Sequence, residues 1–237
     1  MIKLYNMRMP FAAVLGFFAI TTLMSSCQKE LLFDTPVSPG GGGGGITPTV
    51  CNTYFPLTTG NKWTFNQGGM IQVNTVITPD TVINGKTFKR LSSVSAGVTN
   101  INFAEEENGN VYVFQNLAAG SSGASGAVLL NPLRTNAAVG EKWNDTITVN
   151  GFTERFAYTM VEKNIAYQVD TLHFSNVIHV QYKVRLDLPP VYTDELSQIT
   201  DIWYAKCVGA IEIKNQAVLL GVTVNTTDNK IQSYTLH

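Results

Sequence analysis

The sequence predicts an all-β domain in which an antiparallel sheet folds into a sandwich or a half-open barrel, with at most one short helix. Segments rich in β-branched and aromatic residues recur at residues 87–94, 111–115, 156–162, 178–186, 210–214 and 222–227. The dipeptide Asn-Gly, the strongest short hairpin signal, occurs at residues 84–85, 108–109 and 150–151. No window of about a dozen residues carries a sustained apolar stripe of helical period.

Three local features complete the predicted secondary structure. Asp228-Asn229 is expected to turn the last hairpin, because both residue types favour turns. The segment TDELSQI, residues 193–199, is the best helix candidate, with Thr193 as its N-cap. The Gly-, Ser- and Ala-rich stretch from Asn116 to Pro132 predicts a mobile loop or an extended hairpin tip.

The N-terminus predicts an export signal over residues 1–26. Lys3 and Arg8 form a basic start, and the apolar run from Phe11 to Met24 is too short to span a membrane. The run ends in LMSSC, which resembles the lipobox of bacterial lipoproteins, although Met24 stands where leucine is commonest. In that family the cysteine becomes the first mature residue and carries acyl chains. The resemblance therefore implies that Cys27 is lipidated and anchors the protein in the cell envelope, at the outer membrane, facing the periplasm or the surface.

The rest of the chain divides into a tether and one folded unit. Residues 27–50 contain six consecutive glycines, Gly40–Gly45, between prolines, a composition that cannot bury enough apolar surface to form a core. Residues 51–237 are long enough for a single β-rich domain with a substantial core. We therefore expect a domain held away from the membrane by a flexible linker.

With Cys27 acylated, two cysteines remain, Cys51 and Cys207. An even pair in an oxidising compartment makes them candidates for a disulfide, and two unrelated buried thiols are the alternative. Closing so long a loop would contribute roughly 4–5 kcal/mol in the chain-entropy model.

The charge balance argues against a nucleic-acid partner. The chain has 16 Lys and Arg against 17 Asp and Glu, and removal of residues 1–26 takes away two basic residues and no acidic one. No basic run or patch is present in the sequence, so neither nucleic acid nor an anionic lipid surface is an expected partner.

Two of the three tryptophans close a repeated phrase, GNKW at residues 60–63 and GEKW at residues 140–143. Each phrase precedes a predicted strand, so the glycine permits a turn and the indole enters the sheet. We interpret Trp63 and Trp143 as core residues at two equivalent strand starts. The alternative is a pair of aromatic platforms for a sugar or an apolar ligand.

YFPLTTGNKWTF at residues 54–65 and DIWYAKCVGAIEI at residues 201–213 resemble the opening and closing signatures of a broad group of uncharacterised bacterial envelope lipoproteins. The hairpin INGKTF at residues 83–88 and the second Gly-x-x-Trp also match that pattern. The resemblance implies an antiparallel β domain, loosely like the half-open barrels that handle lipids or lipoproteins, and no established reaction. The chain departs at Cys207, where glycine is usual. This departure favours a private link to Cys51 and argues against a left-handed backbone at that position.

The sequence shows no recognisable group of catalytic or metal-binding residues. His173 and His179 would share a strand face about 20 Å apart, too far to share a metal, and His237 is the last residue. The acidic run at residues 105–107 is interpreted as a solvated hairpin end. A calcium site or a glycosidase carboxylate pair would need Asp170 or Asp187 brought near it. No cofactor is expected.

The sequence therefore predicts a lipid-anchored, non-catalytic binding or interaction module. One alternative is a carrier of an apolar ligand or lipid, in which Trp63, Phe65, Trp143, Trp203 and Tyr204 line a cavity. Another alternative is an enzyme that acts on glycans. Beyond the membrane, the expected partner is an unidentified protein, glycan or apolar ligand.

Overall fold

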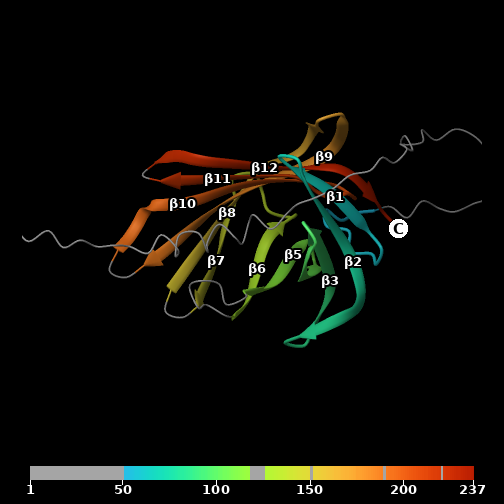
Figure 1. Cartoon of the computed structure of the whole chain (residues 1–237), viewed down its shortest axis with the longest axis horizontal. Helices are drawn as coiled ribbons and strands as arrows, with labels where there is room; N and C mark the ends of the chain where they lie inside the picture. Colours follow the sequence, from blue (N-terminus) through green and yellow to red (C-terminus); the bar gives the residue numbers. More distant parts are fainter. Residues whose placement is uncertain (1–50, 118–125, 150–151, 189–190, 220) are drawn as a thin grey trace, which may run out of the picture.

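The computed structural model describes residues 51–117, 126–149, 152–188, 191–219 and 221–237, and these form one all-β unit (Figure 1). Twelve strands make a single sheet, which confirms the predicted class. The strands are β1 (Lys62–Gln67), β2 (Met70–Ile83), β3 (Lys86–Ser95), β4 (Val98–Glu107), β5 (Asn110–Leu117), β6 (Gly126–Arg134), β7 (Lys142–Val149), β8 (Phe152–Val169), β9 (Leu172–Leu188), β10 (Val191–Ala205), β11 (Gly209–Leu219) and β12 (Val222–Thr235).

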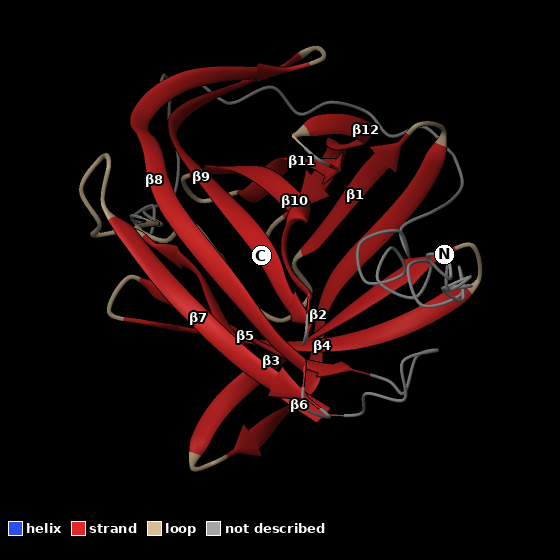
Figure 2. Cartoon of the chain, turned by 90° about the vertical axis from the view of Figure 1, so that its left-hand side faces the viewer, coloured by secondary structure: helices blue, strands red, loops and turns tan. Residues whose placement is uncertain are grey.

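The sheet is an antiparallel meander that curls until its two edges approach each other. Its strand order is β6-β5-β4-β3-β2-β1-β12-β11-β10-β9-β8-β7, so β6 and β7 follow one another in the chain but lie at opposite edges. Figure 2 shows the strands arranged around a common axis. The edges meet through side chains: the Asp145 carboxylate accepts the Asn131 N–H at 2.7 Å, and Trp143 Nε1 donates to the Asn131 carbonyl at 2.8 Å. The result is a nearly closed, barrel-like sheet.

The repeated Gly-x-Lys-Trp phrase forms the same turn twice. Gly60 N donates to Val76 O, and Val76 N donates back to the carbonyl of the residue after Gly60. Gly140 and Met160 repeat both bonds, and the two glycines have φ of 95° and 86°. Each turn begins a run of six strands, β1–β6 and β7–β12. The fold is therefore two similar halves whose junctions are the β12–β1 ladder and the β6–β7 contact.

Two hydrophobic clusters fill the sheet near the Gly-x-Lys-Trp turns. Trp63 and Trp143 are 7% and 4% exposed and belong to different clusters. The first cluster consists of Tyr54, Val111, Leu133, Ala137, Trp143, Tyr158, Met160, Ile178, Val180, Ile202 and Tyr204. The second consists of Trp63, Phe65, Val76, Val169, Phe174, Val177, Ala205, Val208, Ile211 and Ile231.

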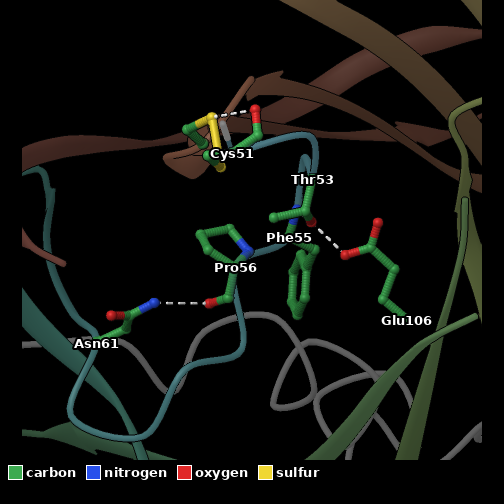
Figure 3. Close-up of a disulfide and its surroundings, with 7 residues drawn as sticks. Cys51, Thr53, Phe55, Pro56, Asn61 and Glu106 are labelled. Atoms are coloured by element: carbon green, nitrogen blue, oxygen red, sulfur yellow. Dashed lines mark hydrogen bonds between the residues drawn. A yellow bond between two sulfur atoms is a disulfide. The ribbon is translucent and has the colours of Figure 1, made fainter. Parts of the chain in front are cut away.

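Residues 51–58, which we call the plug, cross one end of the curled sheet. Tyr54 is buried in the first cluster and Leu57 packs against the second, so the YFPL motif bridges the two. Asn61 Nδ2 donates to the Pro56 carbonyl at 3.1 Å, and Thr53 Oγ1 donates to the Glu106 carboxylate (Figure 3). We call this the plug end. The far end carries the β1–β2, β3–β4 and β11–β12 turns.

The plug is tied covalently to the sheet. Cys51 and Cys207 form a disulfide across 156 positions of sequence, and Cys207 N also donates to Thr53 O at 2.8 Å. Cys207 lies in the turn between β10 and β11 with φ of 68°. The expectation that the cysteine excludes a left-handed backbone here is therefore wrong. The tight β10–β11 turn imposes that conformation, and the cysteine adopts it.

Two of the predicted Asn-Gly hairpin turns are confirmed, and both residues of each turn adopt positive φ. Asn84-Gly85 turns β2 into β3, and Asn108-Gly109 turns β4 into β5, with φ of 51°, 80°, 52° and 77°. The third dipeptide, residues 150–151, lies outside the described residues. Asp228-Asn229 does not turn the last hairpin, because both residues lie inside β12 and the strand begins at Val222. Pairing of both residues with β11, opposite Lys214 and Ile213, overrides the turn propensity.

The helix prediction for residues 193–199 is wrong, because the segment belongs to β10. From Leu196 onward β10 pairs with β11, and from Ser197 with β9, so two neighbours supply the backbone hydrogen bonds. In the stretch predicted as a loop or extended hairpin tip, β5 continues to Leu117 and β6 begins at Gly126, and these two residues lie opposite each other. Residues 118–125 of that stretch lie outside the described residues.

The disulfide and the left-handed backbone at Cys207 give a first prediction. The pair Cys51→Ser/Cys207→Ser should lower the free energy of unfolding by roughly 4–5 kcal/mol, because the loop of the unfolded chain is no longer closed. The pair Cys51→Ser/Cys207→Gly should recover about 1 kcal/mol of that loss, because glycine adopts positive φ without strain. Urea denaturation measures both. Equal stability of the two variants would contradict the backbone argument.

Candidate functional site

Alternation along the strands divides the inner face of the sheet into an apolar part and a polar part. Directly opposed residues of antiparallel strands share a face, so the buried Trp63 and Phe65 place Asn74 and Gln72 beside them on the inside. On β1–β4 and β10–β12, these pairings place uncharged polar side chains on the inner face beyond the apolar clusters, towards the far end, whereas β6 and β9 present Val128, Leu130 and Val184 there. This polar interior consists of Gln67, Gln72, Asn74, Ser93, Ser95, Asn100, Asn102, Gln198, Thr200, Asn215, Thr227 and Asn229.

One half of the polar interior is organised around Gln72, which is fully buried. Its Nε2 donates to Asn74 Oδ1 at 2.6 Å and to Ser93 Oγ at 2.5 Å. Its Oε1 accepts from Asn229 Nδ2 at 3.4 Å, so this amide connects strands β2, β3 and β12. These hydrogen bonds fix the orientation of side chains that are far apart in the sequence.

The other half is organised around Asn215 on β11. Thr200 Oγ1 donates to Asn215 Oδ1 at 2.8 Å, and Asn215 Nδ2 donates to Thr227 Oγ1 at 3.5 Å. Gln198 Nε2 lies 3.4 Å from the same Asn215 oxygen. Opposite Thr200 on β9 is Tyr182, whose ring lies 6.3 Å from that of Phe156. Two half-buried aromatic rings therefore border this row of amides and hydroxyls.

Two acceptors in the polar interior have no partner within the described protein. They are Gln67 Oε1 and Asn229 Oδ1, on side chains that are 8% and 4% exposed. A buried carbonyl oxygen without a donor is costly, so such atoms are normally satisfied by a bound water or a ligand. Asn74, Asn100, Asn102 and Thr227 also face inward and yet are only half-buried. The inner face is therefore reached by solvent in this region.

A cavity of about 50 Å³ lies where the polar interior meets the plug. It is lined by Phe55, Pro56, Trp63, Asn74, Leu91 and Gly209. A single water takes up about 30 Å³ in the liquid, and sites for drug-sized ligands measure about 300–1,000 Å³. This cavity is thus too small for an acyl chain.

The five aromatic residues proposed to line a cavity do not come together. Trp63 and Phe65 lie in one hydrophobic cluster, whereas Trp143 and Tyr204 lie in the other. Both indole N–H groups are bonded, that of Trp63 to Val208 O at 2.5 Å and that of Trp143 to Asn131 O. Trp203 alternates with Ile202 and Tyr204, so its side chain lies on the outer face of β10, where it packs against the second cluster.

On that outer face, Trp203 belongs to a group that sequence reasoning missed. The His179 ring stacks on Trp203 with centroids 4.3 Å apart, and Tyr167 stacks on the other side at 5.0 Å. His179 Nε2 lies 2.8 Å from Asp201 Oδ1, and Nδ1 lies 3.3 Å from Glu162 Oε2. We call these five residues the His179 cluster. They come from β8, β9 and β10 through cross-strand register, which no local spacing reveals.

The His179 cluster holds the connected ends of β8 and β9 against the sheet, where they bend over in Figure 2. Tyr167 OH donates to Glu212 at 3.1 Å, and Lys230 pairs with Asp170 at 3.7 Å. Burial alone would raise the pKa of Asp201, but hydrogen bonds from His179 and Gln181 outweigh it and lower the pKa. Both imidazole nitrogens face carboxylates, so neither is positioned to activate a nucleophile. The arrangement is suited to fastening a hairpin.

The remaining predicted residues are dispersed. His173 is exposed, and the backbone N–H of His237 donates to Asn61 Oδ1 at 2.8 Å. Of the acidic run, Glu107 pairs with Lys86 at 2.5 Å at the β4–β5 hairpin end, and Glu106 accepts from the plug. No group of three His, Cys, Asp or Glu side chains in the described part of the chain could hold a metal ion. Cys27 and the tether lie outside the described residues.

Comparison with known proteins finds a similar fold but identifies no family. No protein-family model matches the chain, and no curated protein matches it. Among solved structures, the crystal structure of a "putative lipoprotein" from Parabacteroides distasonis superposes with a TM-score of 0.50 and 12% identity, over 78% of this chain and 99% of that one. At this identity the likeness concerns the fold alone. Within the described residues, no helix is long and apolar enough to cross a membrane.

Glu106 beneath the plug gives a prediction on pH. Burial raises the pKa of its carboxyl, and the hydrogen bond from Thr53 only partly opposes this. The folded state therefore holds this proton to higher pH than the unfolded state, and its contribution to stability falls as pH rises above the ordinary glutamate range. Glu106→Gln should gain stability relative to the wild type as pH increases from 4 to 8, measured by urea denaturation. The exposed Glu107→Gln is the control, and parallel curves for all three proteins would contradict the prediction.

Proposed function

We propose that the chain is a lipid-anchored, non-catalytic binding module of the cell envelope whose binding site is the polar interior. One observation carries this proposal: inward-facing amides and hydroxyls, two of them with unpartnered oxygens, line the sheet beyond its hydrophobic core. A sheet that needed only to be stable would fill this space with apolar side chains, because buried polar groups are costly unless every one is bonded.

The position of the tether supports the proposal. Cys51, where the tether would join the domain, lies at the plug end. A lipid on Cys27 would therefore connect to the domain at the plug end and leave the far end free of the anchor. The lipobox-like LMSSC and the fold shared with a protein named as a "putative lipoprotein" support the anchor.

The two other functions receive less support. An apolar carrier needs an apolar cavity; Val128, Leu130 and Val184 make part of the inner face apolar on β6 and β9, but the 50 Å³ cavity beside the plug is too small for a lipid. A glycan-acting enzyme needs two carboxylates facing its substrate. Glu162 and Asp201, the closest such pair around His179, are both engaged by that ring and lie on the outer face.

The binding site can be tested by native mass spectrometry of the full chain, expressed with its own signal in the bacterium that encodes it. The protein is extracted in a detergent that has no sugar headgroup. We expect a mass above that of the acylated chain that is lost on denaturation. A bare mass after extraction from its own envelope would contradict a resident ligand.

The anchor gives a separate prediction. Cys27→Ser should abolish acylation, because serine provides no thiol to receive the lipid, and the protein should no longer partition into the detergent phase. Ser25→Ala keeps a small residue before the cysteine and should remain anchored. Intact mass and phase partitioning check both variants. Retention of Cys27→Ser in the detergent phase would contradict the anchor.

A further inference from the structure

The polar interior carries no formal charge. Its twelve side chains are all Gln, Asn, Ser or Thr, and the charged residues that flank them on β10, β11 and β12, such as Asp201, Lys214 and Asp228, lie on the outer face. On β11, Asn215 faces inward and the flanking Lys214 faces Asp228 outside; on β10, Thr200 faces inward and Asp201 outward. An ionic ligand bound inside would lose its hydration without meeting a counter-charge. The lining therefore selects for an uncharged ligand.

The unpartnered atoms define the hydrogen-bonding character of that ligand. Gln67 Oε1 and Asn229 Oδ1 are both acceptors, so they need a donor. An acyl chain offers no donor, and an ionised carboxylate or phosphate offers only acceptors. A hydroxyl group donates to one neighbour and accepts from another, which matches amides and hydroxyls that carry both functions. The lining thus favours a ligand with many hydroxyl groups.

Two aromatic rings beside the polar interior add an apolar contact for a ligand. Phe156 and Tyr182 are half-buried on the inner face, next to the Thr200–Asn215 row. Rings of this kind contact the C–H face of a molecule whose edges are polar. A twelve-stranded curl is also wider than the eight-stranded barrels that side chains alone can fill. Tyr182, Thr200 and Asn215 lie opposite one another on three neighbouring strands, so the rings and the amides share one inner face.

We propose that the polar interior binds a neutral carbohydrate, either free or as the glycan part of a larger molecule. This inference rests on the proposed binding function and specifies its ligand class. The sugar hydroxyls would satisfy Gln67 and Asn229, and the second N–H of the Asn215 amide would donate to a neighbouring hydroxyl. No bond is made or broken, because the polar interior as described presents amides and hydroxyls, and the inward-facing Asp145 beside Phe156 accepts a hydrogen bond from Asn131 N across the sheet edges.

The test is isothermal titration calorimetry of the full acylated chain in a sugar-free detergent. The probes are neutral hexasaccharides of glucose, mannose, galactose and xylose, with hexagalacturonate as the acidic probe and palmitate as the apolar one. We expect at least one neutral hexasaccharide to bind at about 1 mM or below, and the two other probes not to bind.

A matched pair of variants locates the site. Asn215→Ala should weaken binding about ten-fold, because a buried amide contact is lost, whereas its outward-facing neighbour Gln216→Ala should leave binding unchanged. If Asn215→Ala lowers the melting temperature, the variant Asn100→Ala replaces it, with Thr99→Ala as its outward-facing control on β4. Equal affinities in both members of a pair would overturn the assignment of the site.

Failure of all neutral hexasaccharides at about 1 mM, or preferential binding of hexagalacturonate or palmitate, would overturn the carbohydrate assignment. A lipid or an acidic compound found in the native mass spectrum would do the same and leave the binding function standing. A bare native mass together with no binding of any probe would overturn both proposals.

Discussion

Two buried indoles hold the curled sheet together at its plug end. The N–H group of Trp63 binds a carbonyl in the turn after β10, and that of Trp143 binds a carbonyl on β6, so each ring bonds to a part of the sheet remote from its own strand. Strand twist makes a sheet of twelve strands curl, but it does not decide where the edges meet. The repeated Gly-x-Lys-Trp turn fixes that closure twice, once for each half of the chain. The apolar clusters, the plug and the contact between β6 and β7 all depend on these two rings.

Because the rings, the plug and the clusters concentrate apolar packing at one end, the sheet remains wide enough at the other end to keep a polar inner surface. The plug end of the strands therefore stabilises the fold, and the far end carries the proposed binding site. Phe65 contributes to the core, and the next inward residue, Gln67, contributes an unpartnered oxygen to the polar interior. Outer-face groups such as the His179 cluster then serve to fasten the bent hairpin, without occupying the inner face.

Local signals in the sequence predicted much of the fold and little of the site. The turn at Asn84-Gly85 could be predicted because a two-residue hairpin needs positive φ at both positions, and this requirement is local. Residues 193–199 were misread because the pairing partners of β10 are decided elsewhere. The polar interior depends on cross-strand register, because the pairing partners of each strand decide which of its residues face inward. Gln72 and Asn229, 157 positions apart, share a hydrogen bond that no local pattern encodes.

The place of the disulfide determines how a pull on the tether would enter the domain. Tension arriving at Cys51 passes through the sulfurs to Cys207 as well as along the chain towards β1. Through the sulfurs, the force meets the sheet at the turn between β10 and β11, two strands flanked by neighbours on both outer sides. A pull on the tether would therefore be shared between β1, which the chain enters after Cys51, and the β10–β11 turn, and each of these strands is hydrogen-bonded to a neighbour on both sides.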